Sequence, residues 1–165
     1  MNFNSQLCTT KEQSEMLIGF GIKKETADMV WHYTESRCKA MEWELKPHPP
    51  TLRSTTRFNI ERLNILGQKN ADGRVMTGEE YFDKLWGRDV PAWCLHRLVK
   101  MLPCVIDAHP TLHLTLMPDA VFYTTENNDE DYERPFSIHG NIYDNIIDCV
   151  EWLIQQGHFN EDYLV

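Results

Sequence analysis

The sequence lacks a long hydrophobic run. No uninterrupted apolar stretch among its 165 residues approaches the roughly 20 that a helix needs to cross a bilayer. Residues 1–13 are polar, and they lack the basic start, apolar stretch and small-residue cleavage site of a secretory signal. We therefore expect a cytoplasmic protein with no membrane association.

The cysteines are odd in number and widely and irregularly spaced. The five cysteines form an odd number, unlike the even sets that staple small secreted domains. Free cysteine commonly behaves as a small buried hydrophobic residue. We expect free thiols, mostly buried, at Cys8, Cys38, Cys94, Cys104 and Cys149.

The sequence also lacks the patterns that hold metals and phosphates. Neither GxGxxG nor the P-loop pattern occurs, so no cofactor is expected. The nearest metal-type cluster is Cys104, His109 and His113. In an extended segment the two histidines would lie roughly 13 Å apart, too far to bind one zinc ion. We predict no metal site.

What is present is typical of a globular protein. Hydrophobic residues make up 42% of the chain and charged residues 25%, and five tryptophans supply large side chains for burial. A chain of this mass buries roughly 70% of the surface that its unfolded form exposes. We predict a single domain over residues 1–165.

Two capping-box patterns mark helix starts. Thr9 with Glu12 predicts a helix over residues 10–20, in which the Thr9 hydroxyl accepts a hydrogen bond from the backbone N–H three residues on. Thr77 with Glu80 has the same pattern and predicts a second helix directly after it.

Three further helices follow from apolar spacing and end signals. Pro91 suits the first turn of a helix that ends before Pro103, because the missing N–H has no partner to lose there. A short helix is predicted over residues 59–67 and a longer one over residues 141–157. The stretch 30–45 fits a strand in its first part and a helix in its second, and both alternatives stay open.

The predicted strands follow one another in the second half of the chain. Residues 111–117 alternate apolar and polar side chains, which is the pattern of a half-buried strand. Residues 120–125 are predicted to form a second strand that runs back beside it. Residues 135–139 supply a third strand after an exposed acidic loop at 126–134. The resulting class is α+β, with a small antiparallel sheet of about three strands, a β-meander, covered by several helices.

Charge is unevenly distributed along this acidic chain, whose net charge is −9. Residues 46–74 carry six basic and two acidic side chains, whereas residues 119–165 carry one basic and eleven acidic side chains. Clustered like charge creates a field that attracts an oppositely charged partner, so two copies could pair as a homodimer. The candidate binding patch consists of Lys46, Arg53, Arg57, Arg62, Lys69 and Arg74.

Cys8 is the candidate nucleophile. It lies just ahead of a predicted helix start, where partial positive charge stabilises a thiolate. A base would also be needed, and His32, His96 and His139 are the candidates, among which the sequence does not choose. We favour the simpler interpretation that Cys8 is a half-buried residue before a helix cap.

Five short strings carry a resemblance. They are CTTKEQS from Cys8, TADM from Thr26, WEL from Trp43, PAW from Pro91 and IDCV from Ile147. In this order they resemble a group of small uncharacterised proteins of prophages and mobile elements in gut-type anaerobic bacteria. The resemblance implies a cytoplasmic location and a phage-linked role, and it supplies no activity or catalytic residues.

The sequence therefore favours a non-enzymatic protein-interaction module with an unidentified protein partner. The absence of a convergent catalytic pattern, the uneven charge and the abundant tryptophan support this interpretation. One alternative is an enzyme with a cysteine and histidine site. Another is a nucleic-acid-associated protein that uses residues 46–74, against which stand a pI near 5.2 and the lack of a helix-turn-helix or zinc finger.

Overall fold

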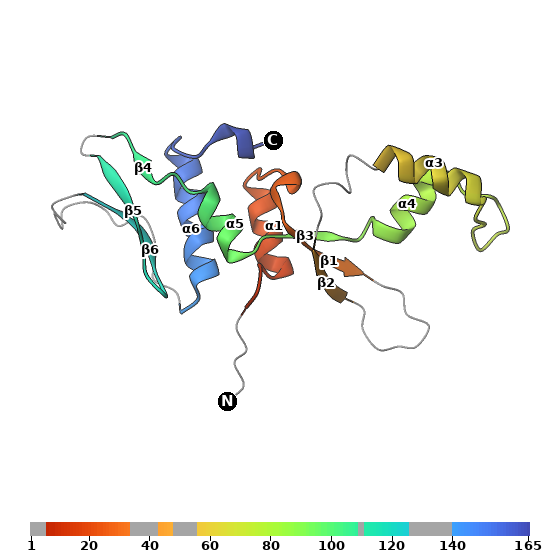
Figure 1. The fold of residues 1–165 in the computed structure, drawn as a ribbon, viewed down its shortest axis with the longest axis horizontal. Coiled ribbons are helices and arrows are strands. Elements are labelled where there is room, and N and C mark those ends of the chain that lie inside the picture. The colour runs from red at the N-terminus through yellow and green to blue at the C-terminus, as the bar shows by residue number, and fades with distance from the viewer. Residues whose placement is uncertain (1–5, 34–42, 48–55, 109–110, 126–139) are drawn as a thin grey trace, which may run out of the picture. The chain divides into compact units, whose positions relative to one another are not determined.

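The protein has an α+β fold with small antiparallel sheets, which confirms the predicted class (Figure 1). The computed structural model describes residues 6–33, 43–47, 56–108, 111–125 and 140–165, with side chains in the first helix after residue 55 described from Ile60 onward. Two three-stranded sheets are present in these residues, where the sequence predicted one.

The chain divides into two compact units, and each is described by itself. Met1–Thr26 and Trp93–Val165 form the terminal unit, and Ala27–Ala92 form the central unit. Compact units of this kind can still belong to one domain, so the single domain over residues 1–165 stays a prediction.

The terminal unit is built around its longest helix, α6. This helix packs against α1, α5 and strand β6, so it lies between the sheet and the other helices (Figure 1). Its apolar stripe is buried at Ile146, Cys149, Val150 and Leu153, as its spacing predicts, whereas Ile142 at the start of the stripe is half-buried. The elements are α1 (Lys11–Gly19), the 3-10 turn η1 (Lys24–Thr26), α5 (Leu95–Met101), β4 (Val105–Ile106), β5 (Leu112–Leu116), β6 (Val121–Thr124), α6 (Ile142–Gln155) and the 3-10 turn η2 (Glu161–Tyr163).

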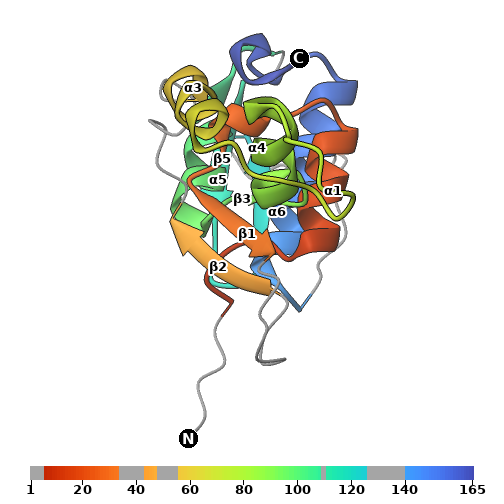
Figure 2. The ribbon, with the colours of Figure 1, turned by 90° about the vertical axis from the view of Figure 1, so that its right-hand side faces the viewer.

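The central unit combines a sheet with a helix pair. Its strands β1 (Met29–Tyr33), β2 (Trp43–Pro47) and β3 (Val90–Ala92) lie in the order β2-β1-β3, all antiparallel (Figure 2). Helices α3 (Thr56–Leu66) and α4 (Gly78–Trp86) pack against each other. The ambiguous stretch after residue 30 thus begins and ends as strands.

The predicted cap of α1 was wrong by one residue. The Thr10 hydroxyl accepts from the Gln13 backbone N–H at 3.2 Å, and the Gln13 side chain accepts from the Thr10 N–H at 2.9 Å. Thr9 is fully buried instead, where its hydroxyl accepts from the Trp93 backbone N–H at 3.0 Å and bonds the Ser14 hydroxyl at 2.7 Å. The capping pattern fits both threonines, and the distant contact with Trp93 decides between them.

The predicted helix start at Pro91 was also wrong. Pro91 lies in β3 opposite Val30, and α5 begins only at Leu95, with Cys94 in the N-cap position. Because β3 is an edge strand, its proline has one side on which no N–H is needed. The pairing with β1 therefore outweighs the local preference of proline for a first helical turn.

The remaining predictions are mostly confirmed. Strands β5 and β6 match the predicted pair, although the observed third strand of their sheet is β4. The predicted strand at 135–139 and the loop at 126–134 lie outside the described residues. Helix α3 ends as predicted at Gly67, whose φ of 57° is in the left-handed region that favours glycine.

Two findings bear on the expected location. No helix in the described parts of the chain is long and apolar enough to cross a membrane. The described cysteines form no disulfide: Cys8 and Cys149 are buried, Cys94 is partly exposed and Cys104 is exposed. Cys38 lies outside the described residues.

Candidate ligand-binding cleft

The central unit contains a cleft of about 550 Å³. This volume lies within the usual range of small-molecule sites. Its walls come from β1, from the turn between α3 and α4, from α4 and from the residues just after it. The lining residues are His32, Tyr33, Gln68, Lys69, Met76, Tyr81, Asp83, Lys84, Leu85 and Arg88.

The cleft carries a local excess of positive charge. Lys69, Lys84 and Arg88 line it, and Asp83 is the carboxylate among the lining residues. The whole chain has a net charge of −9, so the cleft differs in sign from the protein around it. A concave surface concentrates such a field, and this favours an anionic ligand.

Aromatic contacts hold Arg88 at the wall of the cleft. The centre of its guanidinium lies 4.7 Å from the centroid of the Tyr33 ring, a cation–π distance. The Tyr33 ring in turn packs edge-on against Trp43 of β2, with centroids 5.2 Å apart. Strand pairing therefore supports the position of this cation.

A hydrogen bond orients His32. Its Nδ1 lies 2.7 Å from the Asp89 carboxylate, and the two side chains are only 16% and 19% exposed. His32 lines the cleft and Asp89 does not, so the Nδ1 edge is bonded behind the wall. Nε2 is then the ring nitrogen that can form a hydrogen bond with a ligand, and the Asp89 carboxylate fixes the orientation of the ring.

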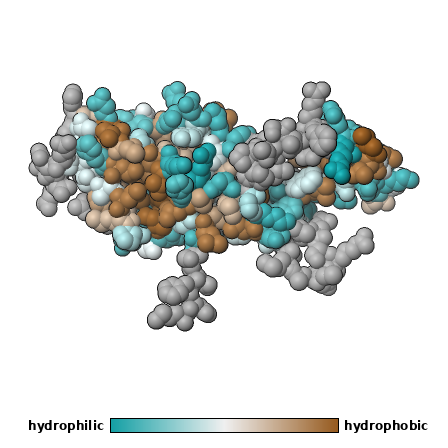
Figure 3. Space-filling model, in the orientation of Figure 1, coloured by the Kyte–Doolittle hydropathy of each residue, from teal (hydrophilic) through white to brown (hydrophobic). Residues whose placement is uncertain are grey.

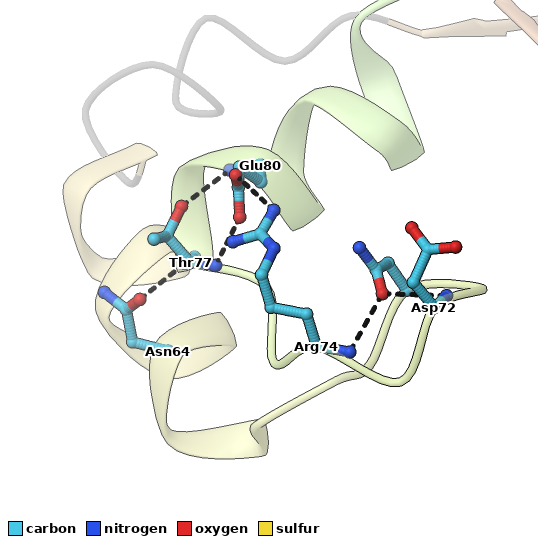
Figure 4. Close-up of polar contacts among 7 residues, drawn as sticks. Asn64, Asp72, Arg74, Thr77 and Glu80 are labelled. Atoms are coloured by element: carbon cyan, nitrogen blue, oxygen red, sulfur yellow. Dashed lines mark hydrogen bonds and ion pairs between the residues drawn. The ribbon is translucent and has the colours of Figure 1, made fainter.

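A polar network at the start of α4 positions the helix that carries Tyr81 and Lys84 (Figure 4). The predicted capping box is confirmed: the Thr77 hydroxyl accepts from the Glu80 N–H at 3.2 Å, and the Glu80 carboxylate accepts from the Thr77 N–H at 2.9 Å. The Arg74 guanidinium donates to Glu80 at 2.8 Å and lowers the pKa of that carboxyl.

The two helices of the central unit touch at Gly78. Its backbone N–H donates to the side-chain oxygen of Asn64 in α3 (Figure 4). A Cβ at Gly78 would lie 2.1 Å from the backbone oxygen of Ile60. Only glycine permits this approach, which fixes α4 against α3 and so sets the wall of the cleft.

The described members of the basic patch predicted from residues 46–74 have different surroundings. Lys46 is paired with Glu44 at 3.1 Å, and Arg74 with Glu80 at 2.8 Å. Lys69 alone of the described members lines the cleft, while Arg62 is exposed on α3. Arg53 lies outside the described residues, as does the side chain of Arg57.

The catalytic candidates are distributed over both units. Cys8 is buried in the terminal unit, which also carries His96, exposed on α5. His32 lies in the central unit with Asp89 as its partner. His139 lies outside the described residues. Among the side chains that the structure describes, no group of three or more His, Cys, Asp or Glu could hold a metal ion.

Sequence reasoning missed most of the cleft. Tyr81, Lys84 and Arg88 are three and four residues apart, a spacing that places side chains on one face of a helix. This was the available signal, although Arg88 lies just beyond the end of α4.

Comparisons with protein-family models, with curated proteins and with solved structures gave no match to this chain.

Proposed function

We propose that this protein is a non-enzymatic binding module whose central cleft takes a phosphate-bearing small molecule. One observation carries the proposal: Lys69, Lys84 and Arg88 line the same cleft in an acidic protein. Lysine and arginine are the usual partners of phosphate, because their charged donors make the strongest hydrogen bonds to its oxygens.

The shape of the cleft favours an organic phosphate over the bare ion. A volume of about 550 Å³ is far more than one phosphate fills. Tyr33 and Tyr81 add aromatic surface beside the cations, where a flat ring can pack. A nucleoside monophosphate combines both chemical features.

The lining favours binding over catalysis. It includes no serine, threonine or cysteine among the residues described, so the nucleophiles most often activated by a histidine are missing beside His32. Asp89 then serves to hold the His32 ring as a ligand contact.

Calorimetric titration with adenosine monophosphate and with inorganic phosphate at low ionic strength tests the proposal. Lys84→Gln removes one cleft cation, and Lys100→Gln is its control because both lysines are exposed and both lie in the last turn of a helix. Loss of one charge-assisted contact costs about 1.5 kcal/mol. We therefore expect nucleotide binding to be roughly tenfold weaker for Lys84→Gln and unchanged for the control Lys100→Gln.

Two results would contradict this function. The first is no measurable heat with either probe. The second is equal weakening by both substitutions, which would mean that the probe responds to net charge and not to the cleft.

A second candidate function is docking of a protein partner on the end of α3. Ile65 is 85% exposed, Leu66 54% and Val75 51%, and Figure 3 shows hydrophobic surface at this end of the helix. Large exposed aliphatic side chains that lie close together are typical of interaction sites. A protein partner or a second copy of the chain would dock on this apolar surface, in place of the charge pairing considered from the sequence.

Sedimentation of the wild type and of Ile65→Ser distinguishes the partners. A second copy predicts a dimer that the substitution converts to a monomer. A monomeric wild type at all concentrations would exclude the homodimer.

A cytoplasmic location and a phage-linked role are also part of the proposed function. The lack of disulfides among the described cysteines supports the location, and the resemblance of the five sequence strings supports both.

A further inference from the structure

Cys8 and Cys94 face each other across a short antiparallel backbone bridge in the terminal unit. The neighbouring Thr9 N–H donates to the Trp93 carbonyl at 2.9 Å. Hydrogen-bonded and non-hydrogen-bonded positions alternate along an antiparallel pair, so the two cysteines occupy a non-hydrogen-bonded position. Their side chains therefore lie on the same face of the bridge.

This position has the dimensions of a disulfide. Non-hydrogen-bonded partners have Cα atoms about 4.5 Å apart and bring their Cβ atoms close together. Disulfides span Cα separations of roughly 4.4–6.8 Å. A bond between Cys8 and Cys94 thus needs little movement of the backbone.

Buried groups hold the two segments together. Thr9 and Trp93, the residues beside the cysteines, are both 0% exposed. The Trp93 backbone N–H donates to the Thr9 hydroxyl at 3.0 Å, and the Trp93 indole N–H donates to the Thr26 hydroxyl at 2.9 Å. The folded chain therefore holds the two cysteine-bearing backbone segments side by side, and the Cys8 thiol, which donates to the Thr9 carbonyl at 3.4 Å, has only to rotate to reach Cys94.

We propose that Cys8 and Cys94 are a reversible redox pair, oxidised to a disulfide by a low-molecular-weight disulfide such as oxidised glutathione. Cys94 is partly exposed and Cys8 is only 3% exposed, so Cys94 meets the oxidant first. Transient disulfides of this kind are the usual ones in reducing compartments.

The exchange proceeds in two balanced steps. The Cys94 thiolate attacks one sulfur of oxidised glutathione, which forms a mixed disulfide and releases one glutathione thiolate. The Cys8 thiolate then attacks the Cys94 sulfur and releases the second glutathione. The two protein thiols lose two electrons to the glutathione disulfide, and their two protons end on the two glutathione thiols.

The other described cysteines are internal controls. Cys149 is fully buried, and burial raises the pKa of its thiol to about 12, so it supplies almost no thiolate. Cys104 is exposed and can take up glutathione, but it lies outside the bridge.

Oxidation of the full chain with glutathione disulfide, followed by acid quenching, alkylation and mass analysis, tests the pair. We expect a product that takes up two fewer alkyl groups than the reduced chain, and a peptide that links Cys8 to Cys94 and is two hydrogen masses lighter than its two unmodified parts. Cys104→Ser should form the same link. Cys8→Ser should instead accumulate a glutathione adduct on Cys94, because the second step has lost its thiol.

Three results would overturn the proposal. One is a link between Cys94 and a different cysteine. Another is a glutathione adduct on Cys94 that persists equally in the wild type and in Cys8→Ser. The third is the same yield of the Cys8 to Cys94 link from the guanidinium-denatured chain, because the pairing would then owe nothing to the fold.

Discussion

Replacing Gly78 with alanine tests whether the contact between α3 and α4 holds the cleft wall in place. The new Cβ would lie 2.1 Å from the Ile60 backbone oxygen and 2.9 Å from the Asn64 side-chain carbon. A methyl group has no other rotamer, and the Ile60 oxygen belongs to a helix backbone. Helix α4 must therefore move away from α3.

The cost follows from two losses. Forcing an extra carbon into a packed contact costs about 1–3 kcal/mol. The displacement also weakens the hydrogen bond from the Gly78 N–H to Asn64, which is worth about 1 kcal/mol. The higher helix propensity of alanine offsets less than about 1 kcal/mol of these losses, because Gly78 is the first residue of the helix. We expect the free energy of unfolding to fall by roughly 2–3 kcal/mol.

Urea unfolding followed by circular dichroism measures this change, and hydrogen exchange locates it. Exchange should accelerate in α3 and α4. Adenosine monophosphate should bind more weakly, because α4 carries Tyr81 and Lys84 of the cleft. Gly19→Ala is the matched control: Gly19 ends α1, has nothing within 4 Å of its added carbon, and should be neutral or stabilising by up to about 1 kcal/mol.

An unchanged urea midpoint for Gly78→Ala would refute this reasoning. Unchanged exchange in α3 and α4 would do the same, since it would show that the helices do not meet at Gly78.

Two further predictions concern the caps. Thr9→Val should lower the free energy of unfolding, measured in urea, by about 2–3 kcal/mol, because it leaves the buried Trp93 N–H without its acceptor. Thr10→Ala should lower it by about 1 kcal/mol, the usual cost of losing an N-cap. A larger loss for Thr10→Ala than for Thr9→Val would restore Thr9 as the cap. The folded pKa of Glu80 lies below its ordinary value of 4.5 because of its bond with Arg74, so its stabilisation is present above pH 4.5 and is lost as the pH falls through the folded pKa. Glu80→Gln should therefore flatten the acid limb of the stability curve, and an acid limb identical to that of the wild type would contradict the pairing.

Features whose partners lie a few residues apart were predictable from the sequence. The capping box of Thr77 and Glu80 needs only residues three apart, and the N-cap Asn141 and the stripe of α6 are equally local. The cap of α1 was predicted wrongly because its choice between Thr9 and Thr10 depends on Trp93, which is distant in the sequence.

The strand at Pro91 was missed for the same reason. A local reading places proline in a first helical turn, whereas pairing with Val30 of β1 places it at a sheet edge. No local pattern contains that pairing, so the sheet of the central unit could not be predicted from it.

Counting charge along the chain did not locate the cleft. The segment 46–74 is basic in total, but Glu44 and Glu80 lie just outside it and pair with Lys46 and Arg74. The cleft instead combines Lys69 with cations that follow in α4 and beyond it. His32 was a candidate by residue type alone, because its partner Asp89 comes from far along the chain.

The most direct test of the proposed cleft is a nuclear magnetic resonance titration of the isotope-labelled full chain with adenosine monophosphate. We predict saturable shifts at the backbone amides of His32, Tyr81, Lys84 and Arg88 and at neighbouring residues of the central unit. Saturable shifts confined to the terminal unit, or no shift at millimolar nucleotide, would contradict the proposed function.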